Sequence, residues 1–322
     1  MKLGEKANIG SNIYATLTDT VVHMVGPSIK TNASKSLFDW RDKKALHFNQ
    51  DDVKEIRLKA PQGSFHFVKE GTDWKINEPV TARAENHKVT NIMLKLRNTN
   101  IKSVAVEETN DLKRFGLKKP AYQVDLFSGA EKAKSTVSFG PLKGNKAYGK
   151  DDVRPHIFTV DSSYMKPFRQ SLFDFRYKKI SEFDTKAADS LSIFYDNTLM
   201  TLKKDSADKW IFASGGKTKN WQVTSMLSAV SNLQAASFVK QEAKSFRRYG
   251  LEKPEGKFEV FAAGVKICEL HTGAHKKETV YARNAMNASV VTIDDEKLKR
   301  LFLKKDDLLD DSEKTETEAA EE

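Results

Sequence analysis

The sequence predicts an α+β fold of tandem repeated units, each a twisted, mainly antiparallel sheet with one or two helices on one face. Three observations predict this class. The chain repeats itself after about 134 residues, short stretches alternate with period two, and one helical apolar stripe recurs in each copy. A repeat of this length is typical of tandem domains, because each copy is long enough to enclose its own core.

The clearest repeat is an aromatic–Gly–Leu motif that ends in Lys–Pro. It runs from Phe115 to Pro120 and returns from Tyr249 to Pro254, 134 residues later. Glycine after an aromatic residue at the end of a turn typically adopts a left-handed backbone, and the following proline stops any helix. The motif therefore supplies two pairs of structural repeat positions, Gly116 with Gly250 and Pro120 with Pro254.

Aromatic residues and arginines complete the structural repeat positions: Trp74 and Trp210; Tyr14, Tyr148 and Tyr281; Arg41 and Arg176. Each tryptophan lies where a predicted hairpin returns. Because a buried indole supplies a large apolar area, we interpret both as core residues rather than as ligand-stacking residues. Each arginine follows an acidic residue, Asp39 or Asp174, by two positions. This spacing predicts a local ion pair at the junction between units, with a binding role for the arginine as the alternative.

Comparison of the copies divides the chain into four parts. Residues 1–46 match only the closing third of a unit, residues 47–180 form unit one, residues 181–309 form unit two, and residues 310–322 form an acidic disordered tail. The opening part lacks the strands with which it would pair in a full unit. Either the natural protein begins further upstream, which is the preferred interpretation, or this part packs on unit one as an extra layer.

Within a unit, the pattern predicts strands, a helix, more strands and a closing helix. In unit one, strands are expected over residues 53–58 and 64–69, and a turn at 70–73 leads into a returning strand at Trp74. The helix is expected where apolar residues recur at i, i+3, i+4 and i+7, which are Val89, Ile92, Met93 and Leu96 in unit one and Val223, Met226, Leu227 and Val230 in unit two. The closing part should hold strands over residues 122–127 and 135–139, around Tyr148 and over 156–160, and then a helix starting at 161–163.

Composition indicates a folded protein with a disordered end. From Asp306 to Glu322 the chain carries nine acidic residues and one lysine, so this stretch is expected to be disordered and its deletion to leave the fold intact. The rest of the chain carries 53 basic and 35 acidic residues, a net charge of +18. We interpret this excess as a solvated basic surface; an anionic lipid surface, an acidic partner or a nucleic acid is the alternative.

Membrane and redox signals are weak. No apolar run approaches the roughly 18 to 20 residues that span a bilayer, and no apolar signal core follows Met1. The single cysteine, Cys268, cannot form a disulfide within the chain.

Motifs that would indicate an enzyme are weak or missing. His271 and His275 are four residues apart, but the repeat places the first in a strand and the second in the loop after Gly273, so a metal site is not expected. Gly140–Lys146 resembles a phosphate-binding loop but lacks its spacing and its Gly–Lys–Ser/Thr ending. The acidic pair Asp151–Asp152 is interpreted as solvated. We therefore expect no catalytic residue, metal or cofactor.

The order of the repeated motifs resembles the repeat of the bacterial domain of unknown function 4340. The resemblance is carried by Trp74-x-Ile76-x-x-Pro79, the helix Val89–Leu96, Phe115-Gly116-Leu117-x-x-Pro120, the strand ending at Gly140, Tyr148, and Leu172-x-Asp174-x-Arg176. It covers nearly the whole chain before the tail, in two full copies and one partial copy. Unit two departs from it, with Ala213–Ser214 at the position of Pro79.

Members of that family are typically envelope proteins with a single inner-membrane span and repeats outside the cytoplasm, often beside ABC-transporter components of the gliding-motility auxiliary type. The resemblance implies a non-enzymatic, partner-binding accessory module on the periplasmic side of the inner membrane, here without its anchor. A cytoplasmic location is the alternative. The expected partner is a protein of a transporter or another envelope component. The alternative function is a basic-surface module that binds nucleic acid or another polyanion, for which binding should weaken steeply with salt.

Overall fold

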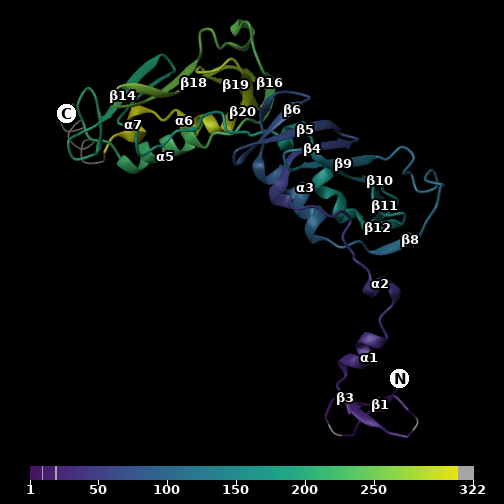
Figure 1. Cartoon of the computed structure of the whole chain (residues 1–322). Helices are drawn as coiled ribbons and strands as arrows, with labels where there is room; N and C mark the ends of the chain where they lie inside the picture. The colour runs from purple at the N-terminus through teal and green to yellow at the C-terminus, as the bar shows by residue number, and fades with distance from the viewer. Residues whose placement is uncertain (9, 19, 311–322) are drawn as a thin grey trace. The chain divides into compact units, whose positions relative to one another are not determined.

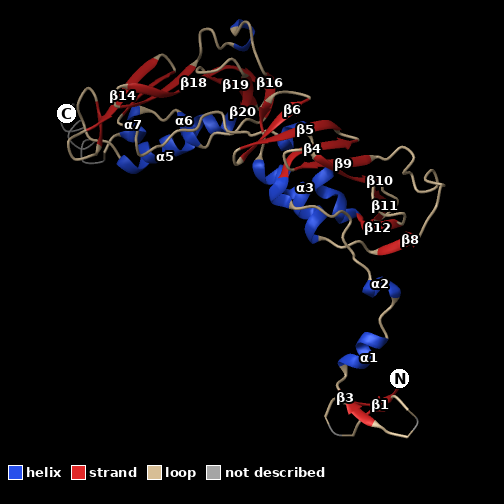
Figure 2. Cartoon of the chain, in the orientation of Figure 1, coloured by secondary structure: helices blue, strands red, loops and turns tan. Residues whose placement is uncertain are grey.

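The computed structural model describes residues 1–8, 10–18 and 20–310; the predicted tail lies outside these residues from position 311 onward. Contacts divide the chain into two compact units, one from Met1 to Arg176 and one starting at Tyr177. This boundary lies four residues before the one expected after residue 180. Mainly antiparallel sheets carry helices on one face in both units (Figure 2), so the predicted α+β class with repeated units is confirmed.

The opening segment forms a small sheet of its own (Figure 1). Its elements are β1 (Lys2–Lys6), β2 (Ile13–Thr16), β3 (His23–Val25), α1 (Ser28–Ala33) and α2 (Leu37–Trp40). The three strands pair antiparallel in the order β1-β2-β3. The strand β1 was not predicted, and because it pairs with β2, the opening segment does not lack every partner strand. The buried core of unit one starts further along, at Ala45.

The main sheet of unit one has nine strands in the order β7-β6-β5-β4-β9-β10-β11-β12-β8. The strands are β4 (Val53–Ala60), β5 (Gly63–Glu70), β6 (Asp73–Glu78), β7 (Ala82–Arg83), β8 (Ser103–Val106), β9 (Tyr122–Ser128), β10 (Ala133–Phe139), β11 (Lys146–Asp151) and β12 (Ile157–Asp161). The helical elements are η1 (Gln50–Asp52), α3 (Asn86–Asn98), η2 (Ser162–Arg169) and α4 (Leu172–Phe175).

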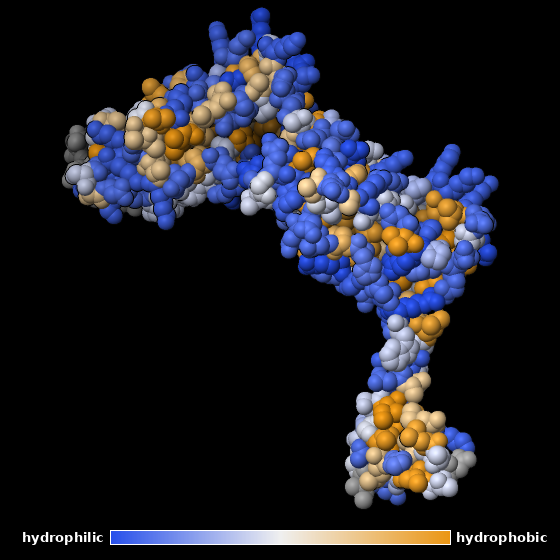
Figure 3. All heavy atoms as spheres, viewed as in Figure 1, coloured by the Kyte–Doolittle hydropathy of each residue, from blue (hydrophilic) through white to orange (hydrophobic). Residues whose placement is uncertain are grey.

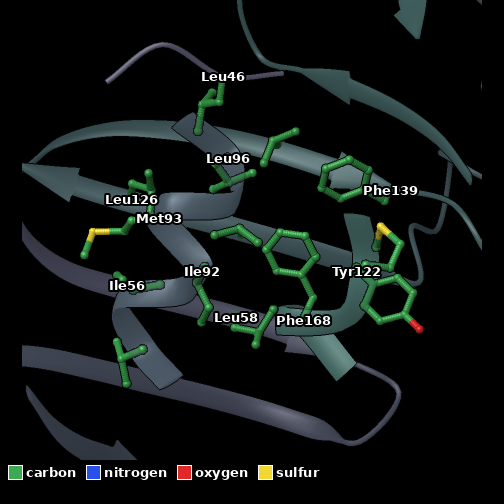
Figure 4. Packing of buried hydrophobic residues seen from close by; sticks show 14 of the residues in the cluster. Leu46, Ile56, Leu58, Ile92, Met93, Leu96, Tyr122, Leu126, Phe139 and Phe168 are labelled. Carbon is green, nitrogen blue, oxygen red and sulfur yellow. The ribbon is translucent and has the colours of Figure 1, made fainter. Parts of the chain in front are cut away.

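One stripe of α3 covers this sheet. Its buried residues are the four predicted ones, Val89, Ile92, Met93 and Leu96. Figure 4 shows the side chains of this helix packed among those of Ile56, Leu58 and Leu126 from the strands. Burial of each aliphatic side chain contributes about 1.5 to 3 kcal/mol, so this stripe holds the helix on the sheet.

The sheet of unit two has eight strands in the order β15-β14-β13-β17-β18-β19-β20-β16. The strands are β13 (Ser190–Tyr195), β14 (Thr198–Lys204), β15 (Trp210–Phe212), β16 (Ser237–Lys240), β17 (Gly256–Ala262), β18 (Val265–Lys276), β19 (Thr279–Asn284) and β20 (Val290–Asp294). The helical elements are α5 (Asn220–Ser231), η3 (Arg247–Tyr249), η4 (Asp295–Lys297), α6 (Leu298–Leu301) and α7 (Lys305–Leu308). The predicted stripe of α5 is buried in the same way as that of α3.

Three expectations from the sequence were wrong. His275 lies in the long strand β18 rather than in a loop. Asp151 is buried rather than solvated, since Arg154 bonds its carboxylate at 2.6 Å. Leu308 is fully buried in the core of unit two, and its carbonyl accepts a bond from Lys219 N at 2.8 Å. A deletion starting at Asp306 would therefore remove part of that core.

Candidate functional site

The aromatic–Gly–Leu motif of unit one folds as a tight junction against the tyrosine strand. Phe115 contacts Tyr148 edge-on, with ring centroids 5.0 Å apart. Gly116 has a φ of +73°, the left-handed conformation predicted from the sequence. A Cβ at Gly140 would lie closer than 3.0 Å to the Phe115 carbonyl oxygen, so this second glycine is needed for the close approach of the two backbones.

Unit two repeats the same junction with different residues. Tyr249 contacts Tyr281 edge-on, with ring centroids 5.1 Å apart, and Gly250 has a φ of +69°. Gly273 takes the place of Gly140, because a Cβ there would again collide with the carbonyl oxygen of the preceding aromatic residue, Tyr249. The junction is thus part of the shared scaffold.

Both predicted tryptophans are buried, Trp74 at 2% and Trp210 at 4% exposure. The backbone N–H of each donates to an asparagine side chain at the start of the next helix, Asn86 at 2.8 Å and Asn220 at 2.7 Å. The sequence interpretation missed these asparagines. The signal was present, because Asn220 lies 134 residues after Asn86.

The remaining repeat positions fall in three environments. Pro120 and Pro254 are partly buried just before β9 and β17, and Tyr14 is exposed on β2. Arg176 is buried, and burial lowers the pKa of its guanidinium. The structure therefore does not gather the predicted positions into one site.

The ion pair expected between Asp39 and Arg41 is wrong. Arg41 instead bonds Glu107 at 2.8 Å. Asp39 is the third residue of α2, and its carboxylate accepts bonds from the backbone and hydroxyl of Ser36 in a capping box. One carboxylate oxygen therefore caps the helix start, and the other accepts from Lys43 at 3.3 Å.

Two carboxylate clusters lie on the strands, and both are neutralised by cations. In unit one, buried Glu55 bonds His66 at 2.8 Å and both Arg57 and Lys132 at 3.0 Å. Burial would raise the pKa of Glu55, but the bond from Lys132 and the charge of His66 outweigh it, and the pKa is lowered. A carboxylate held ionised in this way is unsuited to donate a proton.

In unit two, Lys266 bridges Glu259 at 2.6 Å and Glu269 at 2.9 Å, and His271 bonds Glu269 at 2.8 Å. Burial of Cys268 raises the pKa of its thiol to about 11, which makes it a poor nucleophile. Within the described residues, no group of three or more His, Cys, Asp or Glu side chains is placed to hold a metal ion.

Glu55 should make the stability of unit one depend on pH. Because its folded pKa lies below the ordinary value of 4.5, ionised Glu55 stabilises the fold above that pH, and this contribution is lost as the pH falls through the lowered pKa. The free-energy gap between the parent and Glu55→Gln, measured by urea unfolding, should therefore shrink between pH 7 and about pH 3. The exposed Glu131→Gln change is the control. Parallel decline of the parent and Glu55→Gln would contradict this prediction.

The two units differ in charge in the segment that leads into the aromatic residue. In unit two, residues 240–249 contain four basic residues and one acidic residue, whereas the matching residues 106–115 of unit one contain two basic and three acidic residues. The unit-two segment borders a groove of about 730 Å³ lined by Lys240, Glu242, Ala243, Lys244, Ser245, Arg247, Arg248 and Tyr249. The guanidinium carbon of Arg283 lies 3.9 Å from the centroid of the Phe246 ring, and this cation–π contact stabilises the segment.

This basic groove is the candidate functional site, because both units have the surrounding scaffold, whereas only unit two has the positive charge at this position. Four cations border the groove, Lys240, Lys244, Arg247 and Arg248, an arrangement suited to attract an anionic group. The groove was not identified from the sequence, although the charge difference between the two aligned segments can be read from it.

No helix in the described residues is long and apolar enough to span a membrane.

Comparison with known proteins identifies a family. A family model described as a domain of unknown function (DUF4340) matches residues 1–105, 74–222 and 217–319. The second match starts at Trp74 and ends beyond Trp210, so it crosses the boundary between the two structural units. No curated protein and no solved structure matches the chain. Since the three matched segments together span far more than half of its length, the chain belongs to the DUF4340 family.

Proposed function

We propose that this protein is a non-enzymatic accessory module of the cell envelope that binds an acidic partner protein through the basic groove of unit two. The carrying observation is that two units with the same buried junction have opposite net charges in the segment next to it, −1 in residues 106–115 and +3 in residues 240–249. The two units keep the same scaffold, but the charge of this one loop changes between them. Such a difference favours a role for the loop in recognising a partner.

The proposed partner is a component of an ABC-type transporter or of a motility or export system, and the proposed location is the periplasmic side of the inner membrane. Both come from the resemblance of the repeat to envelope proteins of this kind. The alternative is a polyanion such as nucleic acid, which the same four cations would also attract.

Photo-crosslinking in cells tests the proposal. A photo-reactive amino acid is placed at Ser245, which lines the groove, and at Asp111, the matching position of unit one. The Ser245 variant should crosslink to an envelope protein, and the Asp111 variant should not give the same product. Crosslinking to nucleic acid would favour the alternative, and identical products from both positions would contradict a role for the groove.

Charge reversal gives a quantitative check. Lys244→Glu with Arg247→Glu should reduce binding to the crosslinked partner at least about tenfold at low salt, since two exposed attractions become repulsions. The matched control reverses Lys113 and Arg114 in unit one and should change binding less than about twofold. Affinity is measured by surface plasmon resonance. Equal losses in both double variants would indicate nonspecific charge attraction.

A further inference from the structure

Residues 1–40 repeat the closing part of a unit in structure as well as in sequence. Tyr14 pairs across the sheet with Met24 as Tyr148 pairs with Thr159, and Tyr281 pairs with Thr292 in the same way. The short helices that follow also match, because α2 and α4 each start with a Ser–Asp capping box, and in α7 the Asp307 carboxylate likewise accepts from the N-cap backbone N–H, at 3.2 Å. The strands β1-β2-β3 are therefore equivalent to β10-β11-β12 and to β18-β19-β20.

In both full units these three strands lie between two further strands. β9 and β8 flank them in unit one, and β17 and β16 flank them in unit two. In each case one continuous segment supplies both flanking strands and carries the aromatic–Gly–Leu junction between them: Ser103–Ser128 and Ser237–Ala262. Within the described residues, the sheet of the opening segment has three strands, and no strand pairs with its outer edges.

In the full units this segment covers apolar side chains of the neighbouring strands. The equivalent side chains of the opening segment are exposed. Val22 lies two residues before Met24 and is 66% exposed, whereas the equivalent Ile157 and Val290 are fully buried. Ile157 contacts Phe115 and Leu117 in one apolar cluster. Apolar side chains accordingly gather on the surface of the segment that carries β1 and β3 (Figure 3).

A glycine is also present where the junction would need it. Gly4 lies beside Tyr14, as Gly140 lies beside Tyr148. In unit one the glycine makes room for the Phe115 carbonyl oxygen, but the nearest atoms to a Cβ at Gly4 would all belong to Tyr14, the closest at 3.3 Å. The opening segment thus has counterparts of the residues that contact the aromatic–Gly–Leu motif in a full unit: the glycine Gly4, the tyrosine Tyr14 and the apolar residue Val22.

We propose that β1, β2 and β3 form an acceptor for a strand–loop–strand segment that carries an aromatic–Gly–Leu junction, of the kind that Ser103–Ser128 supplies in unit one. The incoming strands would pair with the outer edges of β1 and β3, and the aromatic ring would contact Tyr14 and Val22. Backbone pairing supplies affinity in such strand addition, and side-chain contacts supply selectivity. Met24 replaces Thr159, which bonds Ser103 at 2.7 Å in unit one, so the donor residue facing Met24 should be apolar.

The test joins residues 103–128, with Ser103→Val, to the full chain through a flexible Gly/Ser linker ahead of Met1. The linker keeps the segment close to β1 and β3 and raises its effective concentration to the millimolar range. Hydrogen exchange of the backbone amides of β1 and β3 should slow at least about tenfold relative to the unfused chain. A peptide of the same sequence added in trans should compete only weakly, since it must be ordered on binding.

Two receptor variants give the control. Val22→Asp should abolish the slowing, because burying valine stabilises by about 1.5 to 3 kcal/mol, or roughly tenfold and more in affinity. Leu17→Asp should leave it intact, since Leu17 is also exposed, at 74%, but its equivalent in unit one is Asp151. Unchanged exchange in the fused chain, or slowing that survives Val22→Asp, would overturn the proposal. Its outcome is independent of the basic groove in unit two.

Discussion

Trp74→Ala is expected to lower the free energy of unfolding of unit one by about 3 to 5 kcal/mol, and Trp210→Ala should do the same in unit two. Both indoles are almost fully buried in the main cores. Truncation removes a large apolar area and leaves a cavity that the sheet and helix fill only in part. Since a domain is stable by about 5 to 15 kcal/mol in total, this loss is a large fraction. Urea unfolding of the full chain, followed by circular dichroism, measures it.

Trp221→Ala is the matched control. Trp221 lies on α5 but is 67% exposed, so its removal should change the free energy of unfolding by less than about 0.5 kcal/mol. If Trp74→Ala or Trp210→Ala unfolds like the control, the indole is not a core residue, and the ligand-stacking interpretation would be the better one.

Gly140→Val is expected to destabilise unit one by about 3 kcal/mol, at the upper end for overpacking. The added Cβ would collide with the backbone carbonyl of Phe115, which cannot move aside as a flexible side chain can. The junction must then open, and Phe115 must leave Tyr148. Gly273→Val should act in the same way in unit two, against the carbonyl of Tyr249.

Gly26→Val separates crowding from the general effect of replacing glycine. The nearest atom to a Cβ at Gly26 is the Ser28 hydroxyl oxygen at 3.8 Å, an ordinary contact. This variant should therefore change the melting temperature little, whereas Gly140→Val should lower it by several degrees, as about 3 kcal/mol implies. Similar melting temperatures for the two variants would show that the junction can relax at little free-energy cost.

The scaffold was predictable because its signals are local and occur twice. The stripe Val89, Ile92, Met93 and Leu96 has helical spacing, and all four residues are buried. Gly116 and Gly250 follow aromatic residues and have the expected positive φ. Each of these features depends on a few neighbouring residues, and comparison of two copies removes much of the ambiguity of a single one.

The candidate sites were less predictable. The basic groove depends on how residues 240–249 fold around Phe246 and Arg283, which are far apart in the chain. The ion pair of Arg41 with Glu107 joins residues 66 positions apart, so the nearby Asp39 was the wrong partner. Which side chains meet across a sheet depends on the register of the paired strands. A pattern of neighbouring residues does not reveal that register.

The sequence by itself determined the α+β class, the two full copies and one partial copy, and the family, because periodicity and internal repetition are properties of residue order. Tertiary structure alone decided the rest. It paired β1 with β2, buried Leu308 and Asp151, and placed His275 in a strand. It also left Val22 exposed while its counterparts Ile157 and Val290 are covered. The physical reason is that burial depends on which strands and loops lie alongside, and those neighbours come from distant parts of the chain.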